Sequence, residues 1–453
     1  MPSLRDMPRK LAHRADSPAP AVASEGTAAT AELAPAPTDG PRGFAWGFVS
    51  QGLSSATNLG LSLLGARVLG PGGLGSVAIG FASYLTILGF QRALVTEPLV
   101  ARSARSSPGI RAQSARRALT VALVGAAVAA LVLALAGIAV GGDIGWALVV
   151  VAPWIPFLVI QDFWRAVLFR DGRARAAAGN DACWLIAMAA TAPVAWWLDS
   201  LWAVVACWGF GALVGTLLGF VQTHTVPDAL RPALRWWRDE LWALGRWLGA
   251  TSLLYSIMSY ATIFALAGLI GTDGLGGIRA VTTIFAPLTL IGAAIALPGL
   301  PALTRALAVS ERHGMKRAFH IGVVCTAVTA AYFGVLSLGG GTIVSMIFGH
   351  SFEHYGHLVW PIGIGQVVTA VAVGFGLLLK AEQRGSAVLV STIVPVTVGL
   401  GLCSALAAVY GVTGAAWGMF AGAVVGTTMT TVLALRPSSA VAPAYGLRTE
   451  PQA

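Results

Sequence analysis

The chain has 453 residues, of which 56% are hydrophobic and only 11% are charged, and its mean hydropathy is +0.75. Soluble domains carry about 25% charged residues, so this composition excludes a protein that lies mostly in water. Lys and Arg outnumber Asp and Glu by 29 to 19, which gives a net charge of +10. The excess lies in short loops between apolar runs, a pattern typical of membrane orientation and not of a nucleic-acid-binding surface.

The first 42 residues are rich in Ala, Pro, Ser and Thr and have little apolar surface to bury. We therefore predict a disordered cytoplasmic tail over residues 1–42. Its basic start is not followed by the apolar stretch of a cleavable signal peptide. The apolar run that begins near Phe44 is expected to be an uncleaved membrane anchor.

About twelve apolar runs follow, most of them about 17 to 25 residues long, the length that a helix needs to cross a bilayer core of about 30 Å. Backbone groups in lipid must be paired within the segment, and these runs lack the short alternating pattern of barrel strands. The sequence therefore predicts an all-α polytopic membrane protein. The expected spans are 44–69, 75–99, 118–140, 145–168, 182–198, 200–222, 244–270, 277–302, 318–338, 357–379, 387–408 and 412–434.

Basic residues gather in alternate loops, after the second, fourth, sixth, eighth and tenth spans. The other loops carry Asp143, Asp199, Asp273 and Glu353 and almost no Lys or Arg. By the positive-inside rule, this bias places the protein in the inner membrane with both termini in the cytoplasm. The last residues, 436–453, are then a second cytoplasmic tail.

The two halves of the chain resemble each other at a constant offset of 201 residues. Trp46 aligns with Trp247, and the segment Leu69–Gly75 (LGPGGLG) aligns with Ile270–Gly276 (IGTDGLG). Six spans in each half give both halves the same orientation, which is the arrangement of parallel repeats in transporters, with substrate bound at the repeat interface. Chance similarity between apolar helices is the alternative.

We therefore predict two pseudo-symmetric six-helix bundles, 43–222 and 244–435, around a central cleft. The linker between them, residues 223–243, mixes arginines with tryptophans. This composition predicts an amphipathic helix on the cytoplasmic surface of the membrane.

A polar stripe runs along the first helix of each half. In the first half it lies at positions i, i+4, i+7 and i+11, which share one helix face. Such residues either hydrogen-bond between packed helices or line a hydrated cavity, and their recurrence in both halves favours the cavity. The stripe comprises Gln51, Ser55, Asn58 and Ser62, and its counterpart comprises Ser252, Ser256 and Ser259 with Tyr255 nearby.

Charged residues inside the spans are candidates for substrate binding, because a charge in lipid is costly. Arg92 lies about 10 Å from the cytoplasmic end of the second span and faces either a cavity or, by snorkelling, the headgroups. Glu97, near that interface, is a candidate for ion coupling. Arg67 and Arg279 lie near the outer ends of their spans and suggest a mouth that attracts anions.

Two further groups of polar residues are expected to have a structural and not a functional role. Asp162 and Arg165, at i and i+3, are expected to pair with each other. His350, His354 and His357 have a spacing that zinc could use, but a solvated interfacial turn is preferred, and we expect no metal. The glycine-rich loops lack the GxxxxGK[ST] pattern, so we expect no bound nucleotide or other cofactor.

The opening of the first half resembles that of polysaccharide flippases. The segment Gly65–Arg105 contains their ARxLGPxxxG core, and Gln161–Asp181 is more weakly similar. These proteins, which include O-antigen and teichoic-acid exporters, belong to the multidrug/oligosaccharidyl-lipid/polysaccharide exporter superfamily. Lipid II flippases of the same superfamily have arginines at places similar to Arg67 and Arg92, but usually have fourteen helices.

The resemblance implies transport of an undecaprenyl-pyrophosphate-linked oligosaccharide to the outer leaflet by alternating access. A pyrophosphate needs a cationic site, and Arg92, Arg67 and Arg279 are the candidates for it, because the guanidinium fork matches phosphate oxygens. Gln51 and Asn58 are expected to hydrogen-bond the substrate. A polysaccharide polymerase or glycosyltransferases are the expected protein partners, and no nucleic acid is expected.

Two alternatives remain. A drug or cation antiporter of the same superfamily would require a carboxylate in the middle of the first bundle, whereas the sequence places Glu97 and Asp162 at the periphery. A membrane-bound polymerase or glycosyltransferase would need a large extramembrane loop with catalytic groups. The longest outer loop, about 339–356, is short, so we expect a transporter and not an enzyme.

Overall fold

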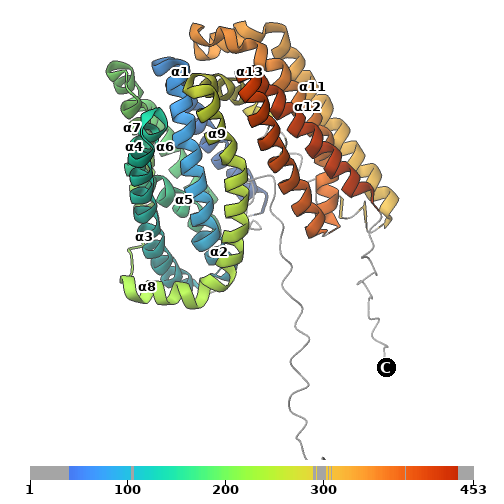
Figure 1. Cartoon of the computed structure of the whole chain (residues 1–453). Coiled ribbons are helices and arrows are strands. Elements are labelled where there is room, and N and C mark those ends of the chain that lie inside the picture. Colours follow the sequence, from blue (N-terminus) through green and yellow to red (C-terminus); the bar gives the residue numbers. More distant parts are fainter. Residues whose placement is uncertain are drawn as a thin grey trace, which may run out of the picture.

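A computed structural model describes the chain over residues 40–103, 107–288, 292, 303–304, 306–307, 309–382 and 384–436. For residues 40–44, 101, 243–244, 247–259 and 385 it describes the backbone alone. Over the described residues, every regular element is a helix (Figure 1). In the described part of the chain, nine helices are long and apolar enough to cross a membrane, which confirms the predicted fold class of a polytopic α-helical protein. Four described helices, α1, α9, α11 and α13, bend at a glycine, and in α1, α9 and α13 the two arms fall on two different predicted spans.

The first half contains the predicted spans one to six. The fifth and sixth spans, which the sequence spaces most tightly, form α6 and α7 as separate helices. The elements are α1 (Gly40–Gln91), η1 (Arg92–Thr96), α2 (Glu97–Ser103), α3 (Pro108–Val140), α4 (Gly142–Val151), η2 (Ala152–Trp154), α5 (Ile155–Arg170), α6 (Ala174–Leu198) and α7 (Leu201–Thr223).

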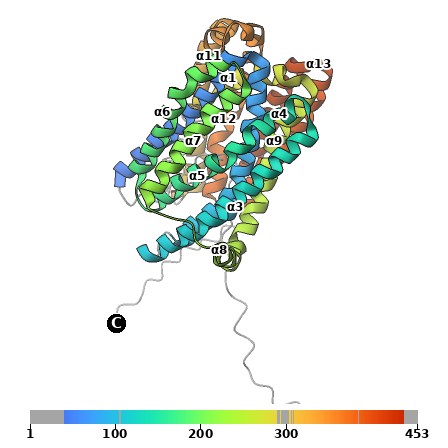
Figure 2. The same ribbon diagram turned by 90° about the vertical axis from the view of Figure 1, so that its left-hand side faces the viewer.

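The linker and the second half follow in the same manner. In Figures 1 and 2, α8 runs across one end of the molecule and leads into α9. The elements are α8 (Leu230–Trp236), η3 (Trp237–Leu241), α9 (Trp242–Ile284), α11 (Glu311–Phe348), η4 (His350–Leu358), α12 (Val359–Ala381) and α13 (Gly385–Leu435).

The two ends of the molecule differ in composition. The basic end carries α8 and the helix ends and loops with Arg102, Arg111, Arg170 and Arg384, and it is the end that the sequence predicts to be cytoplasmic. The glycine end carries the bends of the long helices, at residues such as Gly70 and Gly271. Four exposed tryptophans of α4, α6 and α7 surround the glycine end, as expected for side chains at a membrane interface. They are Trp146, Trp196, Trp197 and Trp202.

The bends of α1 and α9 are equivalent in position and in conformation. Gly70 has φ 71° and ψ −164°, and Gly271, 201 residues later, has φ 72° and ψ 174°. Positive φ of this kind is accessible to glycine and strained for other residues. The same unusual backbone at matching positions supports the predicted repeat.

The second arms of α1 and α9 touch backbone to backbone just after these bends. A Cβ atom on Gly75 would lie 1.9 Å from the carbonyl oxygen of Thr272, and one on Gly276 would lie 1.8 Å from that of Pro71. Gly75 and Gly276 are again 201 residues apart, so each repeat presents the same glycine to the other. Only glycine fits at this contact.

Among the described residues, a shared apolar core joins the halves at the glycine end, whereas at the basic end the contact is made by the start of α9, where a Cβ on Gly245 would lie 3.1 Å from the carbonyl oxygen of Leu94 in η1. The shared core combines Leu74 and Ala147 of the first half with Leu275, Phe348 and Phe352 of the second. At the basic end the described apolar residues form separate cores, one within the first half and linker and one within the second half. Figure 1 shows α11, α12 and α13 diverging from α1 and α9 toward the basic end.

The linker is pinned to α3 where it begins. The backbone N–H of Asp228 donates to Thr120 Oγ1 at 2.8 Å, and Arg117 Nε donates to the Asp228 carboxylate at 3.3 Å. The backbone N–H of Ala229, 2.8 Å from Asp228 Oδ1, is the main group that holds the pKa of Asp228 below its ordinary value, assisted by Arg117. Further on, Ala233 and Leu241 are buried in the core of the first half.

The glycine contact predicts a specific sensitivity to added side chains. Gly75→Ala or Gly276→Ala would force the backbones of α1 and α9 apart, and we expect each to lower the free energy of unfolding by about 1–3 kcal/mol. Gly125→Ala is the control, because no atom lies within 4 Å of a Cβ at that exposed helical site. Unfolding of the purified proteins in detergent measures the difference. Equal stability of all three variants would contradict the close contact.

Candidate functional site

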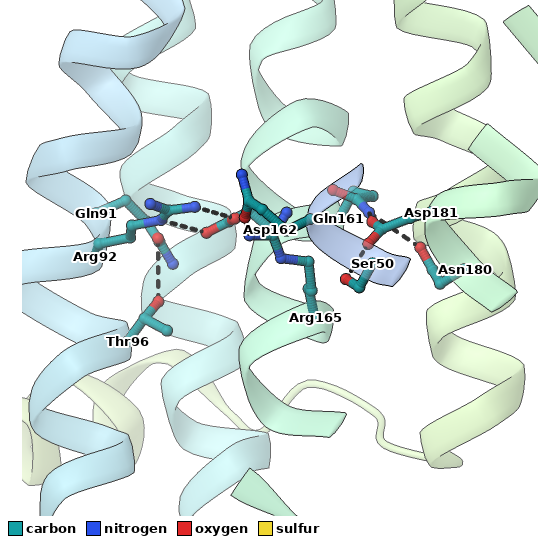
Figure 3. Close-up of polar contacts among 10 residues, drawn as sticks. Ser50, Gln91, Arg92, Thr96, Gln161, Asp162, Arg165, Asn180 and Asp181 are labelled. Carbon is teal, nitrogen blue, oxygen red and sulfur yellow. Dashed lines mark hydrogen bonds and ion pairs between the residues drawn. The ribbon is translucent and has the colours of Figure 1, made fainter. Parts of the chain in front are cut away.

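A cluster of polar and charged side chains lies inside the first half, toward the basic end (Figure 3). The residues come from α1, η1, α5 and α6 and lie two to three helical turns, about 10–15 Å, from the ends of the spans. Two arginines and two aspartates balance in charge. This polar cluster comprises Ser50, Gln51, Gln91, Arg92, Gln161, Asp162, Arg165, Asn180 and Asp181.

Arg92 forms a two-pronged ion pair with Asp162 across the bundle. Its Nε lies 2.8 Å from Asp162 Oδ2 and its Nη2 lies 2.5 Å from Oδ1, and the two side chains are 13% and 5% exposed. The guanidinium therefore binds a carboxylate inside the bundle and does not reach toward the headgroups. Arg92 also begins η1, a π-helical turn between α1 and α2, and such turns often occur at functional sites.

The predicted pairing of Asp162 with Arg165 is wrong, because Asp162 accepts both of its hydrogen bonds from Arg92. Arg165 instead extends toward α1, where its Nη2 lies 3.4 Å from Gln51 Oε1. Gln51 thus faces the polar cluster within its own half. Next to Arg92, Gln91 Oε1 accepts a hydrogen bond from Thr96 at 3.1 Å, while its buried Nε2 has no partner among the described residues.

Asp181 is a buried carboxylate that sequence analysis missed. It accepts hydrogen bonds from Ser50 Oγ and, at 2.8 Å, from Gln161 Nε2. Its neighbour Asn180 donates to the carbonyl oxygen of Gly215 at 2.8 Å, which ties α6 to α7. Asp181 and Asp162 are both buried, so the expectation that the first bundle holds no interior carboxylate is wrong. The predicted span 182–198 began just after Asp181, whereas α6 begins at Ala174 and so places this aspartate two turns inside the helix.

Arg279 lies between the two halves. Its guanidinium stands over the ring of Phe81 in the second arm of α1, 5.0 Å from the ring centre, a favourable cation–π geometry. No described carboxylate lies within ion-pair distance of it. The second arm of α9 begins directly after Gly271, so Arg279 lies about 12 Å from the bend, deeper than the outer end at which the sequence placed it.

Arg67 connects the halves at the glycine end. Its Nε donates to the carbonyl oxygen of Ile347 at 2.9 Å, and its Nη2 donates to that of Met346. These carbonyls belong to the last turn of α11, where helix geometry leaves them without backbone partners. A cation is also favoured there by the helix dipole. Two of the donors of Arg67 thus cap a helix of the opposite half.

The remaining candidates are less well defined. Glu97 begins α2 half-buried, and its charge acts on Arg92. Asn58 is half-buried, and its backbone oxygen accepts a hydrogen bond from Ser62 at 3.1 Å. The side chains of Tyr255 and Ser259 lie outside the described part of the structure.

The histidine segment forms η4 at the glycine end. His350 Nδ1 lies 3.2 Å from the Glu353 carboxylate, and His357 Nε2 lies 3.0 Å from Thr413 Oγ1 just after the bend of α13. These contacts join the turn to itself and to a neighbouring helix, as in an interfacial turn.

Comparison with known proteins bears on the fold. No protein-family model and no curated protein matches the chain. A multidrug resistance transporter of the MATE family, solved in an inward-facing conformation, matches with a TM-score of 0.66 at 14% identity over 86% of this chain and 97% of that one. The chain has the fold of MOP-superfamily transporters.

Two other MOP proteins have the same fold. The lipid II flippase MurJ, in an inward closed conformation, matches with a TM-score of 0.64 at 11% identity over 85% of this chain and 86% of that one. A MOP-superfamily transporter from Pyrococcus furiosus matches with a TM-score of 0.58 at 15% identity over 90% and 97%.

The ion pair inside the polar cluster predicts a strong effect of removing one partner. Asp162→Asn would leave the buried Arg92 cation without its carboxylate, and we expect it to lower the free energy of unfolding by about 3–5 kcal/mol. The double variant Arg92→Gln/Asp162→Asn removes both charges and should recover part of the loss.

Glu240→Gln serves as the matched control in the same unfolding measurement. Its partner Arg102 lies 3.0 Å away, but the two side chains are 50% and 52% exposed. An exposed pair contributes at most about 1 kcal/mol. If Asp162→Asn were as stable as Glu240→Gln, the pair would not be the internal neutralising contact described above.

Proposed function

We propose that this protein is a flippase that moves an undecaprenyl-pyrophosphate-linked oligosaccharide across the cytoplasmic membrane by alternating access, for cell-surface polysaccharide synthesis. The observation that carries the proposal is the placement of Arg279 at the contact of the two halves, where the ring of Phe81 faces it and no described carboxylate lies within ion-pair distance. A cation that is costly to hold in a membrane is suited to an anionic ligand. The guanidinium fork matches phosphate oxygens in particular.

The polar cluster supplies a second, neutralised cation. Arg92 is bound by Asp162 in this conformation, so it reaches a pyrophosphate only if the phosphate displaces the carboxylate. In our proposal Arg279 makes the first contact with the pyrophosphate and Arg92 exchanges partners as the halves move. Gln51, Asn58, Tyr255 and Ser259 are proposed to hydrogen-bond the sugars, and Glu97 is proposed to couple transport to an ion.

The packing of the halves suits such a cycle. The shared core at the glycine end corresponds to a state that is closed there, while α11, α12 and α13 diverge from the first half toward the basic end, where the described cores are separate (Figure 1). With the arginine-rich loops in the cytoplasm, this state would receive substrate from the cytoplasmic leaflet. When the glycine end opens, Arg67 would break its hydrogen bonds with the carbonyl oxygens in the last turn of α11.

A second candidate is a drug or cation antiporter of the same superfamily. Asp181 favours it, because this buried carboxylate is hydrogen-bonded by Ser50 and Gln161 and has no described cation within ion-pair distance. A carboxylate of this kind could exchange a proton or a metal cation for an organic cation. We rank the flippase first because Arg279 lies where the halves meet, whereas Asp181 lies inside one half.

The flippase proposal predicts a specific requirement for Arg279. In proteoliposomes that contain a fluorescent undecaprenyl-pyrophosphate oligosaccharide, Arg279→Ala should slow flipping by about tenfold or more, because the pyrophosphate loses a charge-assisted contact. Arg279→Lys should restore part of the rate, since a point charge lacks the fork. Arg231→Ala, an exposed arginine of α8, is the matched control.

Normal flipping by Arg279→Ala, with the protein folded, would overturn the proposal. The antiporter would be supported instead if the protein moved an organic cation against a proton gradient and Asp181→Asn abolished that movement. Both assays use the same vesicles, so the two functions are distinguished in one preparation.

A further inference from the structure

A basic cavity lies at the basic end of the first half, away from Arg279 and from the polar cluster. It has a volume of about 200 Å³ and lies among the first turn of α3, the end of α5 and the end of α7, three helices that Figure 2 shows meeting the basic end. Its polar lining consists of Arg111, Arg170, Asp171, Arg173, Thr223 and Thr225. None of these residues has a role in the proposed transport site.

Positive charge is in excess in this cavity. Three guanidinium groups face one carboxylate, that of Asp171, so two charges are not balanced within the lining. Arg170 is only 1% exposed and is held in place by Asp171, at 2.9 and 3.3 Å, and by Ser103 Oγ at 3.1 Å. Because a guanidinium has five N–H donors, it can bind Asp171 and a further anion together.

The other two arginines are less buried. Arg111 Nη1 lies 3.9 Å from Asp171, a distance too long for a hydrogen bond, and Arg173 Nη1 donates to the carbonyl oxygen of Gln222 at 2.8 Å. Both side chains therefore retain N–H donors for a ligand. The hydroxyl groups of Thr223 and Thr225 line the same space.

The start of α3 adds to this positive field. The helix has 33 residues and begins at Pro108 on the cavity wall, and Ser107 before it provides no side-chain cap. Its first backbone N–H groups and the positive end of its dipole favour an anion. The argument rests on the cavity and its three arginines, and the helix start reinforces them.

We propose that this cavity binds the phosphate group of an anionic phospholipid from the surrounding leaflet. A lipid is favoured over a free phosphate because α3, whose first turn lines the cavity, carries exposed apolar side chains that acyl chains can contact. Ile110 in its first turn is 55% exposed, and exposed Val124, Val128 and Leu131 follow along the helix. Basic pockets between helices at this membrane level are suited to anionic headgroups. The site is independent of the proposed flippase activity.

The test uses the full-length protein purified in a neutral detergent. Retention of dihexanoyl-phosphatidylglycerol is measured by native mass spectrometry, alongside dihexanoyl-phosphatidylcholine and inorganic phosphate. We expect phosphatidylglycerol to bind best, and Arg111→Gln and Arg173→Gln each to weaken it about tenfold through loss of a charge-assisted hydrogen bond. Arg235→Gln, an exposed arginine of α8 outside the cavity, should bind as the unaltered protein does.

Three results would overturn the proposal. Unchanged binding in Arg111→Gln and Arg173→Gln would show that the cavity is not the site. An equal loss in Arg235→Gln would show attraction to general surface charge. Inorganic phosphate that binds as tightly as phosphatidylglycerol would show a site for the free ion. Because Arg111 and Arg173 are not fully buried, their variants are expected to fold, and thermal unfolding checks this.

Discussion

The backbone contact between the second arms of α1 and α9 is the constraint on which the rest of the structure depends. Gly75 meets the carbonyl of Thr272, and Gly276 meets that of Pro71, so the two repeats touch through the same atoms. Close approach of this kind maximises van der Waals packing, which is important because helices in lipid have no hydrophobic driving force for association. It brings Phe81 and Arg279 opposite each other within two helical turns, while the described apolar cores of the two halves stay separate at the basic end.

Charge inside the bundles is managed in two ways. In the polar cluster, Arg92 and Asp162 neutralise each other, and Asp181 is held by neutral donors. Replacing both charged residues by apolar ones would be expected to leave the protein as stable or more stable, because the attraction in a buried ion pair seldom exceeds the cost of desolvating the two charges. Arg279 instead faces an aromatic ring. We interpret the polar cluster as a set of ion pairs and hydrogen bonds that can exchange partners during transport. We interpret Arg279 as a cation that is available to a ligand.

Over the described residues, sequence reasoning recovered the membrane-spanning helices, because each helix must be apolar over the bilayer thickness whatever its neighbours are. The second half of the predicted eighth span, from residue 289 on, lies mostly outside the described residues. Sequence reasoning placed Gly70 and Gly271 in equivalent loops but did not show that α9 resumes directly after Gly271, and so put Arg279 too near the surface. It missed Asp181 because its partner Ser50 lies 131 residues away, and no local pattern reports such a contact. The ion pair of Arg92 with Asp162, 70 residues apart, was missed for the same reason.

Alternating access of the two halves is the central claim, and distances between spin labels test it most directly. In a cysteine-free background, one pair at Gln113 and Arg312 reports on the basic ends of α3 and α11, and another at Ile138 and Leu338 reports on their glycine ends; all four residues are exposed. On addition of undecaprenyl pyrophosphate to the reconstituted protein, the account predicts a population in which the first distance shortens and the second lengthens. Two distances that stay unchanged at saturating ligand would contradict it.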